Sequence, residues 1–363
     1  MQNNPSSFLV INPFGIGDVL FSTPLIRVIK ENFPQASISY LCNRRTQAVL
    51  KNHPLITETI VYERDEFEEE RRRSKLAWAR MFFKFIADIK RQKPEVCLDL
   101  SLNSQFGFFA WAAGIKRRVG LNYKGRGRFL TQKVTFDGYN DKHVVEYYLD
   151  VARSLDLSIK THGLEVYTDS RSRSFAGEFL VDNGLKDQPI IGVAPCGGQA
   201  FGPHAYVKRW PQEKFGLLIE RLVKEHRAKV FIFAGPNEKE EVADIMRRAS
   251  CYRDCYEFTD SPLEEIIALV ERCVLFIGND TGPLRFANAL DKKIVALFGP
   301  VDERVYGLYP YDPKKHIVIT KDLGCRPCYK KFKLPACPYQ IRCLQEIGVD
   351  EVYNAAKRLL LPQ

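Results

Sequence analysis

The stretch that decides the fold is VLFIGNDTGPLRFANALDKKIVALFGP, residues 274–300. Apolar runs at its two ends predict two buried parallel strands. Between them, residues 278–282 have turn chemistry, and Pro283 suits the first turn of a helix, where no backbone N–H is needed. The stretch therefore predicts a strand–helix–strand unit, which points a helix N-terminus at the carboxyl edge of a sheet.

An anion is the ligand that such a helix N-terminus favours, because free backbone N–H groups and the helix dipole both attract negative charge. Phosphate is the usual case. An ordinary βαβ unit with a polar loop has the same pattern, and an Asp-Thr-Gly triplet alone does not separate the two interpretations.

Length and composition indicate a soluble protein of two domains. The chain has 363 residues, of which 45% are hydrophobic and 27% charged, so each half is able to bury its own core. No apolar run approaches the roughly 18 residues of a membrane span. The N-terminus lacks the basic and apolar segments of a secretory signal. We expect a cytoplasmic protein.

The net charge of +10 suits nucleic acid, an anionic membrane face or phosphorylated substrates. Lys and Arg are dispersed along the chain, and no nucleic-acid-binding motif is present. Ordinary solubility explains such a charge equally well. We therefore expect no nucleic-acid partner.

Strand and helix patterns alternate in both halves of the chain. An apolar strand near Phe8 is followed by a glycine-bearing loop and a helical pattern that contains Pro24. Either that helix kinks, or Thr23 caps a helix that begins at Pro24. A polar segment, 156–172, is the candidate linker. The alternation predicts an α/β fold with two parallel sheets, whose ligands bind outside the carboxyl ends of the strands.

The charged segment 63–93 is expected to be helical. Its run of mixed charges, 66–73, is typical of a solvated face. The aromatic side chains that follow, from Trp78 to Phe85, are expected to give the segment its core face. The same aromatic density would also suit a surface that faces a membrane or an acceptor.

Three motifs taken together resemble glycosyltransferase family 9, the ADP-heptose:lipopolysaccharide heptosyltransferases. They are GIGDVL at 15–20 with Thr-Pro at 23–24, VKRWP at 207–211, and NDTGP at 279–283 with LFGP at 297–300. The resemblance implies a GT-B fold, with two Rossmann-like domains facing across a cleft. It also implies inverting, metal-independent glycosyl transfer from a nucleotide-diphosphate sugar, without a cofactor.

The resemblance assigns a part to each region of the chain. Residues 1–165 form the acceptor-side domain and 166–345 the donor-binding domain. Residues 346–363 form a C-terminal helix that in this fold crosses back onto the N-terminal domain. The implied partners are an ADP-sugar donor and an acidic, lipid-anchored glycan acceptor at the inner face of the membrane.

Asp18 is the candidate base. Inverting transfer needs a group that takes the proton of the acceptor hydroxyl while its oxygen attacks the anomeric carbon. Asp18 follows Gly15 and Gly17, where the backbone can approach a ligand closely, and the resemblance implies that the aspartate of this motif is the proposed base. From the residues alone, a helix N-cap stays open.

Lys208 is the candidate cation for the departing diphosphate, on which negative charge accumulates. It corresponds to the family's donor-phosphate lysine just before Trp-Pro. A surface lysine beside a core Trp210 is the structural alternative. Both Asp18 and Lys208 are assigned to catalysis.

The donor-binding candidates follow strands of the second half. Thr281 and Gly282 offer a hydroxyl and backbone N–H groups. A carboxylate beside phosphate is unfavourable, so Asp280 is expected to accept hydrogen bonds from sugar hydroxyls or to brace its loop. Glu238 occupies the place where dinucleotide folds bind ribose hydroxyls, although a first-turn helix Glu stays open. Ser261 is expected to edge the adenine.

Arg285 departs from the family, which usually has His at this position. A helix-borne arginine can bind a diphosphate bidentately and more strongly than neutral histidine. It can instead mark an altered donor. The departure concerns the identity of the donor and not the class of reaction.

The acceptor is expected at the N-terminal half. Gly17 and the basic loop with Lys124, Arg126 and Arg128 are candidates to contact acidic sugars or phosphates, with solvated loop charge as the alternative. His143 matches a helix-start histidine of the family and is expected to be structural.

Four cysteines cluster near the C-terminus with spacing compatible with structural zinc: Cys325, Cys328, Cys337 and Cys343. Free or disulfide-linked thiols are the alternative. The resembled family often has such a segment, without a catalytic part for it.

Other classes of protein stay open beside the leading interpretation. One is a glycosyltransferase of this fold that uses a different nucleotide sugar on another glycan or on protein. Another is a non-catalytic nucleotide-sugar-binding protein, against which the presence of both Asp18 and Lys208 argues. A dinucleotide-dependent oxidoreductase fits poorly, because the N-terminal loop lacks the third glycine of that fingerprint.

Overall fold

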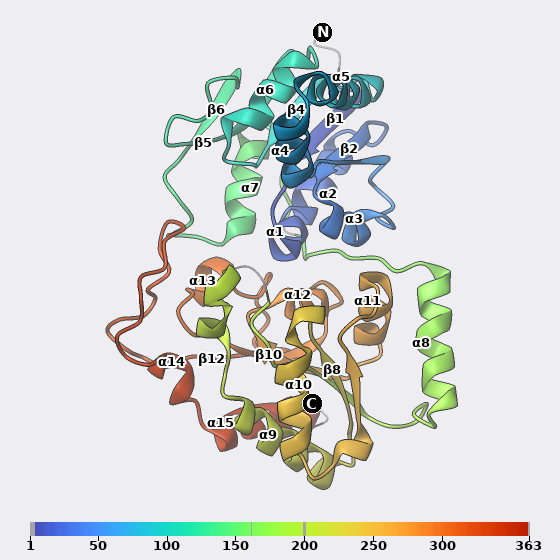
Figure 1. Ribbon diagram of the computed structural model, residues 1–363, viewed down its shortest axis with the longest axis vertical. Helices are drawn as coiled ribbons and strands as arrows, with labels where there is room; N and C mark the ends of the chain where they lie inside the picture. The colour runs from blue at the N-terminus through green and yellow to red at the C-terminus, as the bar shows by residue number, and fades with distance from the viewer. Residues whose placement is uncertain (1–3, 161, 199–200, 362–363) are drawn as a thin grey trace. The chain divides into compact units, whose positions relative to one another are not determined.

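The computed structural model describes residues 4–160, 162–198 and 201–361. The chain forms two compact units, residues 1–163 and 164–363, each built around its own sheet (Figure 1). The division falls close to the expected domain boundary after residue 165.

Unit 1 contains a parallel six-stranded sheet in the order β3-β2-β1-β4-β5-β6. Its central strand β1 pairs with β2 through Phe8 and Ile38 and with β4 through Phe8 and Val96. The strands are β1 (Ser7–Ile11), β2 (Ser37–Cys42), β3 (Glu58–Val61), β4 (Val96–Asp99), β5 (Arg117–Tyr123) and β6 (Gln132–Phe136), and the helices are α1 (Ile16–Phe21), α2 (Thr23–Asn32), α3 (Arg44–Leu50), α4 (Arg64–Arg73), α5 (Lys75–Arg91), α6 (Ser104–Ala112) and α7 (Val144–Arg153).

The helical pattern around Pro24 resolves into two helices. α1 ends at Phe21, and α2 restarts with Pro24 in its first turn, where its missing N–H has no cost. Ser22, rather than Thr23, occupies the cap position. The expected long segment 63–93 is likewise two helices, because Ser74 caps α5 by accepting a hydrogen bond from Ala77 N at 3.2 Å.

Unit 2 contains a second parallel sheet in the order β12-β11-β10-β7-β8-β9. Read from the other edge, its strands follow the same order of connection as those of unit 1, so β10 is the counterpart of β4. The strands are β7 (Ile190–Ala194), β8 (Lys229–Phe233), β9 (Cys255–Phe258), β10 (Leu275–Asn279), β11 (Lys293–Leu297) and β12 (His316–Ile319). The expected α/β fold with two parallel sheets is confirmed.

The helices of unit 2 cover this sheet and include short 3-10 turns. α8 begins at Ser170, so the expected linker 156–172 ends in a helix that the sequence patterns did not reveal. The elements are α8 (Ser170–Asp182), η1 (Gly202–Lys208), α9 (Gln212–His226), η2 (Pro236–Glu238), α10 (Lys239–Arg248), η3 (Tyr252–Asp254), α11 (Leu263–Glu271), α12 (Gly282–Ala289), α13 (Glu303–Tyr306), α14 (Arg342–Gln345) and α15 (Val349–Leu360).

The C-terminal helix α15 packs on α9, β10 and β11 of its own unit, and its expected crossing back onto the N-terminal domain stays a prediction. Its apolar face, with Val352, Tyr353 and Leu359, belongs to the core of unit 2. Polar contacts also hold its ends, because Trp210 Nε1 donates to Ile347 O at 3.0 Å and Lys293 Nζ donates to Leu359 O at 2.6 Å.

Across residues 4–160, 162–198 and 201–361, we find no helix with the length and apolar content needed to cross a membrane.

Candidate active site

Asn279 organises the carboxyl edge of the unit 2 sheet. It is fully buried at the end of β10. Its Nδ2 donates to Pro195 O at 2.6 Å and to Cys196 O at 3.2 Å, and its Oδ1 accepts from Trp210 N at 3.2 Å. One side chain therefore joins the end of β10, the loop after β7 and the start of α9. The sequence motif contains Asn279, but its position at a strand end did not by itself mark it as the organiser of three segments.

Beside it, Lys208, Asp280 and Arg285 form one buried ionic cluster. Lys208 Nζ lies 2.5 Å from Asp280 Oδ2 and also donates to the carbonyl oxygen of Asp280 at 3.2 Å. Arg285 Nη2 pairs with Asp280 Oδ1. All three side chains are at most 10% exposed. The structure thus gathers one predicted catalytic residue and two predicted donor-binding residues.

This cluster has more positive than negative charge, since two cations face one carboxylate. Burial alone would raise the pKa of Asp280, but the charges of Lys208 and Arg285 and their hydrogen bonds outweigh it and hold that pKa below its usual range. Asp280 is therefore ionised at neutral pH. The site retains an excess of about one positive charge, in surroundings where charges act strongly.

Thr281 and Gly282 begin α12 directly after the cluster. Thr281 is the N-cap residue, and its Oγ1 donates to Asn279 O at 3.2 Å. Gly282 and Pro283 form the first turn, as the opening stretch predicted. The N-terminus of α12 adds its partial positive charge to that of the ionic cluster.

Arg285 directs its guanidinium at groups of the protein. Nη1 donates to Gly307 O at 2.6 Å, and Nη2 donates to Tyr306 O at 2.5 Å as well as to Asp280. These contacts fasten α12 to the end of α13. Bidentate binding of a diphosphate by Arg285 stays a prediction, and its contacts within the protein brace the loop of Asp280.

Glu238 joins two glycine loops. Its Oε1 accepts from Gly198 N and its Oε2 from Gly235 N, both at 2.9 Å, and the residue is 7% exposed. Arg209 Nη2 lies 3.8 Å from Oε1. The carboxylate thus ties the loop after β7 to the loop after β8. Ser261, the expected adenine neighbour, is half-buried in the loop before α11.

Asp18 lies in the first turn of α1 and is half-buried, as is Gly17. Buried Asn12, at the end of β1, holds this turn by donating from Nδ2 to Asp18 O at 3.0 Å. His143 caps α7 by accepting from Val145 N at 3.2 Å, and its ring packs edge-on against Phe21 at 4.9 Å. That contact ties α7 to α1, consistent with the structural part expected for His143.

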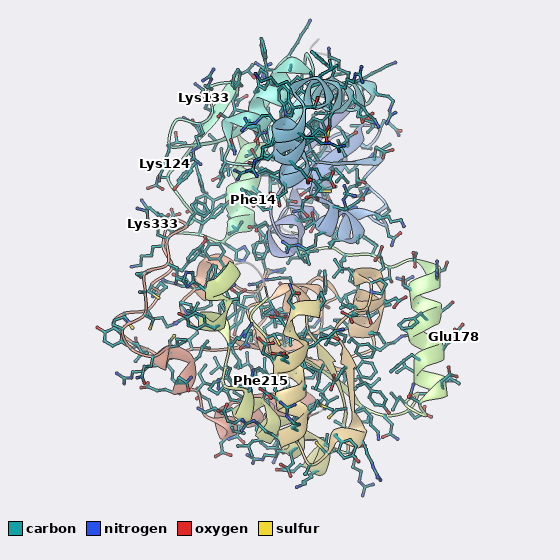
Figure 2. All side chains as sticks on the ribbon, viewed as in Figure 1. Phe14, Lys124, Lys133, Glu178, Phe215 and Lys333 are labelled. Carbon is teal, nitrogen blue, oxygen red and sulfur yellow. The ribbon has the colours of Figure 1, made fainter. Side chains whose placement is uncertain are left out.

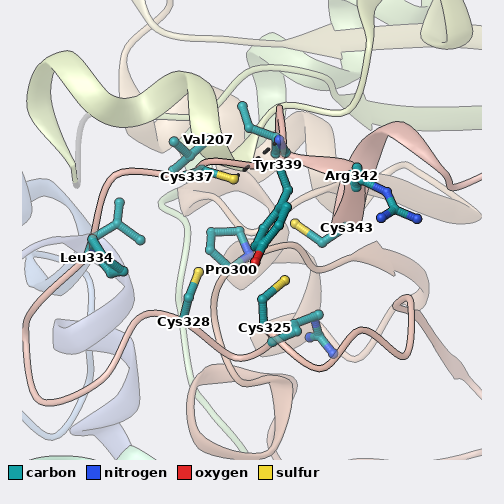
Figure 3. Close-up of a pocket in the computed structure, with 12 residues that line it drawn as sticks. Val207, Pro300, Cys325, Cys328, Leu334, Cys337, Tyr339, Arg342 and Cys343 are labelled. Atoms are coloured by element: carbon teal, nitrogen blue, oxygen red, sulfur yellow. Dashed lines mark hydrogen bonds between the residues drawn. The ribbon is translucent and has the colours of Figure 1, made fainter.

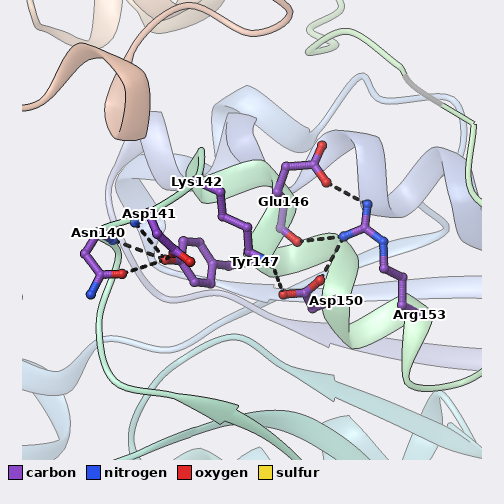
Figure 4. Close-up of polar contacts among 7 residues, drawn as sticks. All are labelled: Asn140, Asp141, Lys142, Glu146, Tyr147, Asp150 and Arg153. Atoms are coloured by element: carbon purple, nitrogen blue, oxygen red, sulfur yellow. Dashed lines mark hydrogen bonds and ion pairs between the residues drawn. The ribbon is translucent and has the colours of Figure 1, made fainter.

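A polar network fixes α7 and the loop before it, as Figure 4 shows. Tyr147 Oη accepts from Asn140 N at 3.2 Å and Asp141 N at 3.3 Å. Arg153 bridges Glu146 at 2.6 Å and Asp150 at 2.8 Å. Because α7 packs on α1 and α2, this network supports the helix that positions Asp18.

The predicted acceptor residues Lys124, Arg126 and Arg128 are all exposed in the loop between β5 and β6. The cations of Lys124 and Arg126 lie 5.0 and 5.6 Å from the centre of the Tyr123 ring, and Arg128 lies 4.6 Å from that of Phe129. They stack on aromatic rings, which leaves their charges accessible to anions.

The four clustered cysteines line one cavity of about 30 Å³ (Figure 3). All four are free, and burial raises the pKa of the Cys343 thiol to about 11. Among the residues that the structure describes, no three His, Cys, Asp or Glu side chains stand close enough to hold a metal ion. As they stand, the thiols do not fit the zinc site that their spacing allows.

The cysteine segment instead supports the loop after β11. Arg326, within this segment, donates from Nε to Gly299 O at 2.7 Å and pairs with Glu303 at 2.6 Å. Cys328 N and Tyr329 N both bond to Pro300 O at 3.0 Å. Sequence patterns gave no sign of these contacts, because they join segments far apart in the chain.

Comparison with known proteins identifies the family. The model of glycosyltransferase family 9 (heptosyltransferase) matches residues 82–337. The lipooligosaccharide heptosyltransferase 2 of Campylobacter jejuni is 25% identical over 355 residues, with 96% of each chain covered. Two solved structures share the fold: the E. coli ADP-heptose LPS heptosyltransferase II, with a TM-score of 0.77, 22% identity and 98% of each chain covered, and a family 9 glycosyltransferase of Veillonella parvula, with a TM-score of 0.79, 23% identity and 99% and 98% covered. The chain has the GT-B fold of these enzymes and is a glycosyltransferase that belongs to family 9.

Proposed function

We propose that this glycosyltransferase moves a heptose, or a related sugar, from an ADP-sugar to a lipopolysaccharide core or another lipid-linked acceptor. The transfer inverts the configuration of the anomeric carbon and uses no metal. The names of the relatives support lipopolysaccharide as the acceptor and heptose as the sugar. One structural neighbour, the E. coli ADP-heptose LPS heptosyltransferase II, supports by its name the choice of donor.

The observation that carries the proposal is the buried cluster of Lys208, Asp280 and Arg285 at the N-terminus of α12. When the bond between sugar and diphosphate breaks, its electron pair stays on the leaving diphosphate oxygen. The excess positive charge of the cluster and the dipole of α12 stabilise that oxygen. Lys208 is the contact residue in this scheme, and Asp280 and Arg285 fix its position.

The carboxylate of Asp18 acts as the general base in this scheme. The acceptor hydroxyl oxygen attacks the anomeric carbon from the face opposite the diphosphate, and its proton passes to the carboxylate of Asp18. A new carbon–oxygen bond forms as the bond to the diphosphate breaks, so the configuration inverts. Lys124, Arg126 and Arg128 contribute charge for an acidic acceptor.

Glu238 is proposed to bind the ribose of the donor. Each of its oxygens accepts one backbone hydrogen bond, and a carboxylate oxygen has a second lone pair for a ribose hydroxyl. Thr281 and Gly282 face the phosphates in this scheme, and Ser261 edges the base.

A thermal-shift panel tests the donor. ADP, UDP, GDP and a nicotinamide dinucleotide are added at equal concentration to the wild type and to Lys208→Met. We expect ADP to raise the melting temperature most, since stabilisation grows with ligand concentration over Kd, and the shift to fall in Lys208→Met. A larger shift with UDP or GDP would replace the ADP-sugar with another nucleotide sugar. A shift with the dinucleotide alone would overturn glycosyl transfer.

The four-cysteine cavity has no part in this chemistry. Metal analysis of protein purified without chelator decides between the two sequence-based hypotheses for it. Stoichiometric zinc would establish a structural metal, and its absence, together with a count of reactive thiols, would leave free or disulfide-linked cysteines.

A further inference from the structure

The positive charge of the chain is concentrated in one segment. Lys and Arg are dispersed, but their excess over Asp and Glu is not: residues 75–136 contain thirteen Lys or Arg and three Asp or Glu. This segment alone therefore has a net charge of +10, equal to that of the whole chain. The net charge of all the other residues together is zero. The segment comprises α5, β4, α6, β5 and β6 with the loops between them, all in unit 1.

The same segment contains a row of exposed or half-buried aromatic rings, which we call the aromatic ridge. They are Trp78, Phe82 and Phe83 of α5, Phe108 and Trp111 of α6, and Phe129 before β6. Neighbouring rings touch throughout. Phe82 lies 5.5 Å from Trp78 and 6.1 Å from Phe108, and Phe129 lies 5.4 Å from Phe108 and 6.0 Å from Trp111. The ridge thus crosses three neighbouring segments of unit 1.

The ridge presents apolar side chains to solvent. Phe83 is 68% exposed and Trp111 54%, and within the described residues no other Phe or Trp is more than half exposed. Leu76, 64% exposed, lies on the outer face of α5 with Phe83, seven residues apart. α5 therefore has an apolar outer face in addition to its inner face, where Phe85, Ile86 and Ile89 are buried. An apolar outer face on a surface helix indicates a partner.

Basic side chains lie in the same segments of unit 1 as the ridge and next to them in sequence. All are exposed, and across the described part of the chain none of them has an ion-pair partner. Figure 2 labels one of them, Lys133, together with Lys124 on the neighbouring loop. They are Arg80, Lys84, Lys116, Arg117, Arg128 and Lys133.

We infer that the aromatic ridge, together with these six basic side chains, docks unit 1 on the surface of a bilayer that contains anionic lipids. Protein surfaces that bind at a membrane interface typically combine Trp and Phe with Lys and Arg. Each Lys or Arg held near such a surface strengthens binding roughly fivefold. The choice of partner rests on the proposed function, because a lipid-linked acceptor is met at a membrane.

The packing of the rings favours a bilayer over single-stranded nucleic acid, which also combines cations with aromatic contacts. Base stacking needs free ring faces. Here Trp78 stacks on Phe82 at 16° and Phe82 on Phe108 at 18°, so these rings cover one another's faces. Insertion among lipid headgroups needs only exposed edges and tips. Leu76 also suits lipid and has no use in base stacking.

Co-sedimentation of the full chain with vesicles tests the inference, without donor or acceptor. The vesicles contain phosphatidylcholine alone or with phosphatidylglycerol. We expect binding only to the anionic vesicles, and weaker binding at high salt. The double variant Phe83→Ser/Trp111→Ser should lose at least about tenfold in affinity, and Lys84→Gln/Lys116→Gln about 25-fold. Unchanged melting temperatures and ADP shifts would show that both variants are folded.

Matched controls lie elsewhere on the surface. Leu217→Ser removes a side chain that is 57% exposed on α9, and Lys160→Gln/Lys186→Gln removes two exposed charges; both should bind like the wild type. Equal losses in ridge and control variants would overturn the inference. So would tighter binding of a single-stranded oligonucleotide with the same dependence on the ridge. Because no sugar transfer is measured, failure here would leave the proposed function standing, and failure of the nucleotide panel would leave this result standing.

Discussion

Corresponding strands of the two sheets end at buried aspartates with opposite acid–base behaviour. Asp99 ends β4 in unit 1, and Asp280 directly follows β10, its counterpart in unit 2. Asp99 is 5% exposed and Asp280 9%. Burial raises the pKa of Asp99 to about 6, whereas the pKa of Asp280 lies below its usual range despite burial.

The neighbours of the two carboxyl groups cause this difference. Asp280 has Lys208 and Arg285 within contact. Asp99 accepts a hydrogen bond from Ser101 N at 2.9 Å and, within the described residues, has no cation beside it. The same place in the fold therefore gives a permanent charge in one unit and an easily protonated acid in the other. In unit 2 the charge of Asp280 holds Lys208 and Arg285 in place, where they are proposed to serve an anionic ligand. In unit 1 the candidate base is not Asp99 but Asp18, in the first turn of α1.

The largest effect is expected at Asp18. Asp18→Asn cannot accept the acceptor proton, so turnover should fall by about 10²- to 10⁴-fold, with the melting temperature and ADP shift unchanged. Sugar transfer at saturating donor is the measurement. Asp99→Asn is the matched control in the same unit and should retain turnover. Wild-type turnover in Asp18→Asn, or an equal loss in Asp99→Asn, would move the base to another residue.

Removing the charge of Asp280 should have the largest effect on stability. Asp280→Asn leaves Lys208 and Arg285 buried without a counter-charge, which costs about 3–5 kcal/mol. Because the folded pKa is lowered, the carboxylate stabilises the fold fully above the unfolded value of 3.8 and progressively less as pH falls below it. Urea unfolding at neutral pH measures the loss.

Asp350→Asn is the control for Asp280, since Asp350 is 86% exposed in its pair with Arg221. Such a surface pair contributes at most about 1 kcal/mol. A loss as small for Asp280→Asn would mean that water reaches the cluster and that its charges are screened.

Asp99→Asn should stabilise the protein, which is the opposite of the effect expected for Asp280→Asn. In the wild type the native state binds the Asp99 proton more tightly than the unfolded state, so stability falls as pH rises from 3.8 to about 6 and is level above. Asparagine does not ionise. The variant should therefore gain about 2–3 kcal/mol above that window and little below it, as measured by urea unfolding between about pH 4 and about pH 8. A gain that is the same at every pH would exclude ionisation as its cause.

Local patterns in the sequence were sufficient for the central strands of the sheets but not for the contacts and charges of the site. The apolar runs and the turn residues of 274–300 predicted β10, α12 and β11, because a buried parallel strand and a helix N-terminus have local signatures. Asp18, Lys208 and Asp280 stood out through motifs. The ionic contact of Asp280 with Lys208 joins residues 72 apart, and no local pattern encodes such a contact.

The same limit explains what the sequence did not predict. Residues 117–136 alternate less clearly than the central strands, and β5 and β6 were not anticipated. The amphipathic pattern of α15 predicted a helix, but it did not show which core the apolar face joins, namely that of unit 2. Asn279 was visible only as part of a motif. Its importance comes from three hydrogen bonds to segments that the fold brings together.

The smallest effect is expected at Glu238, another buried carboxylate of unit 2. Glu238→Gln keeps one acceptor oxygen and places an amide against a backbone N–H, so one of the two bonds to Gly198 and Gly235 is lost. The loss should be about 1–2 kcal/mol in urea unfolding, with weaker binding of ADP if the ribose uses the same carboxylate. Glu241→Gln, which removes the nearby partner of Arg209, should cost less than about 1 kcal/mol and leave ADP binding unchanged. If Glu238→Gln lowers stability but not ADP affinity, Glu238 fixes the two loops without touching the nucleotide; if it changes neither, the loops are held by other contacts.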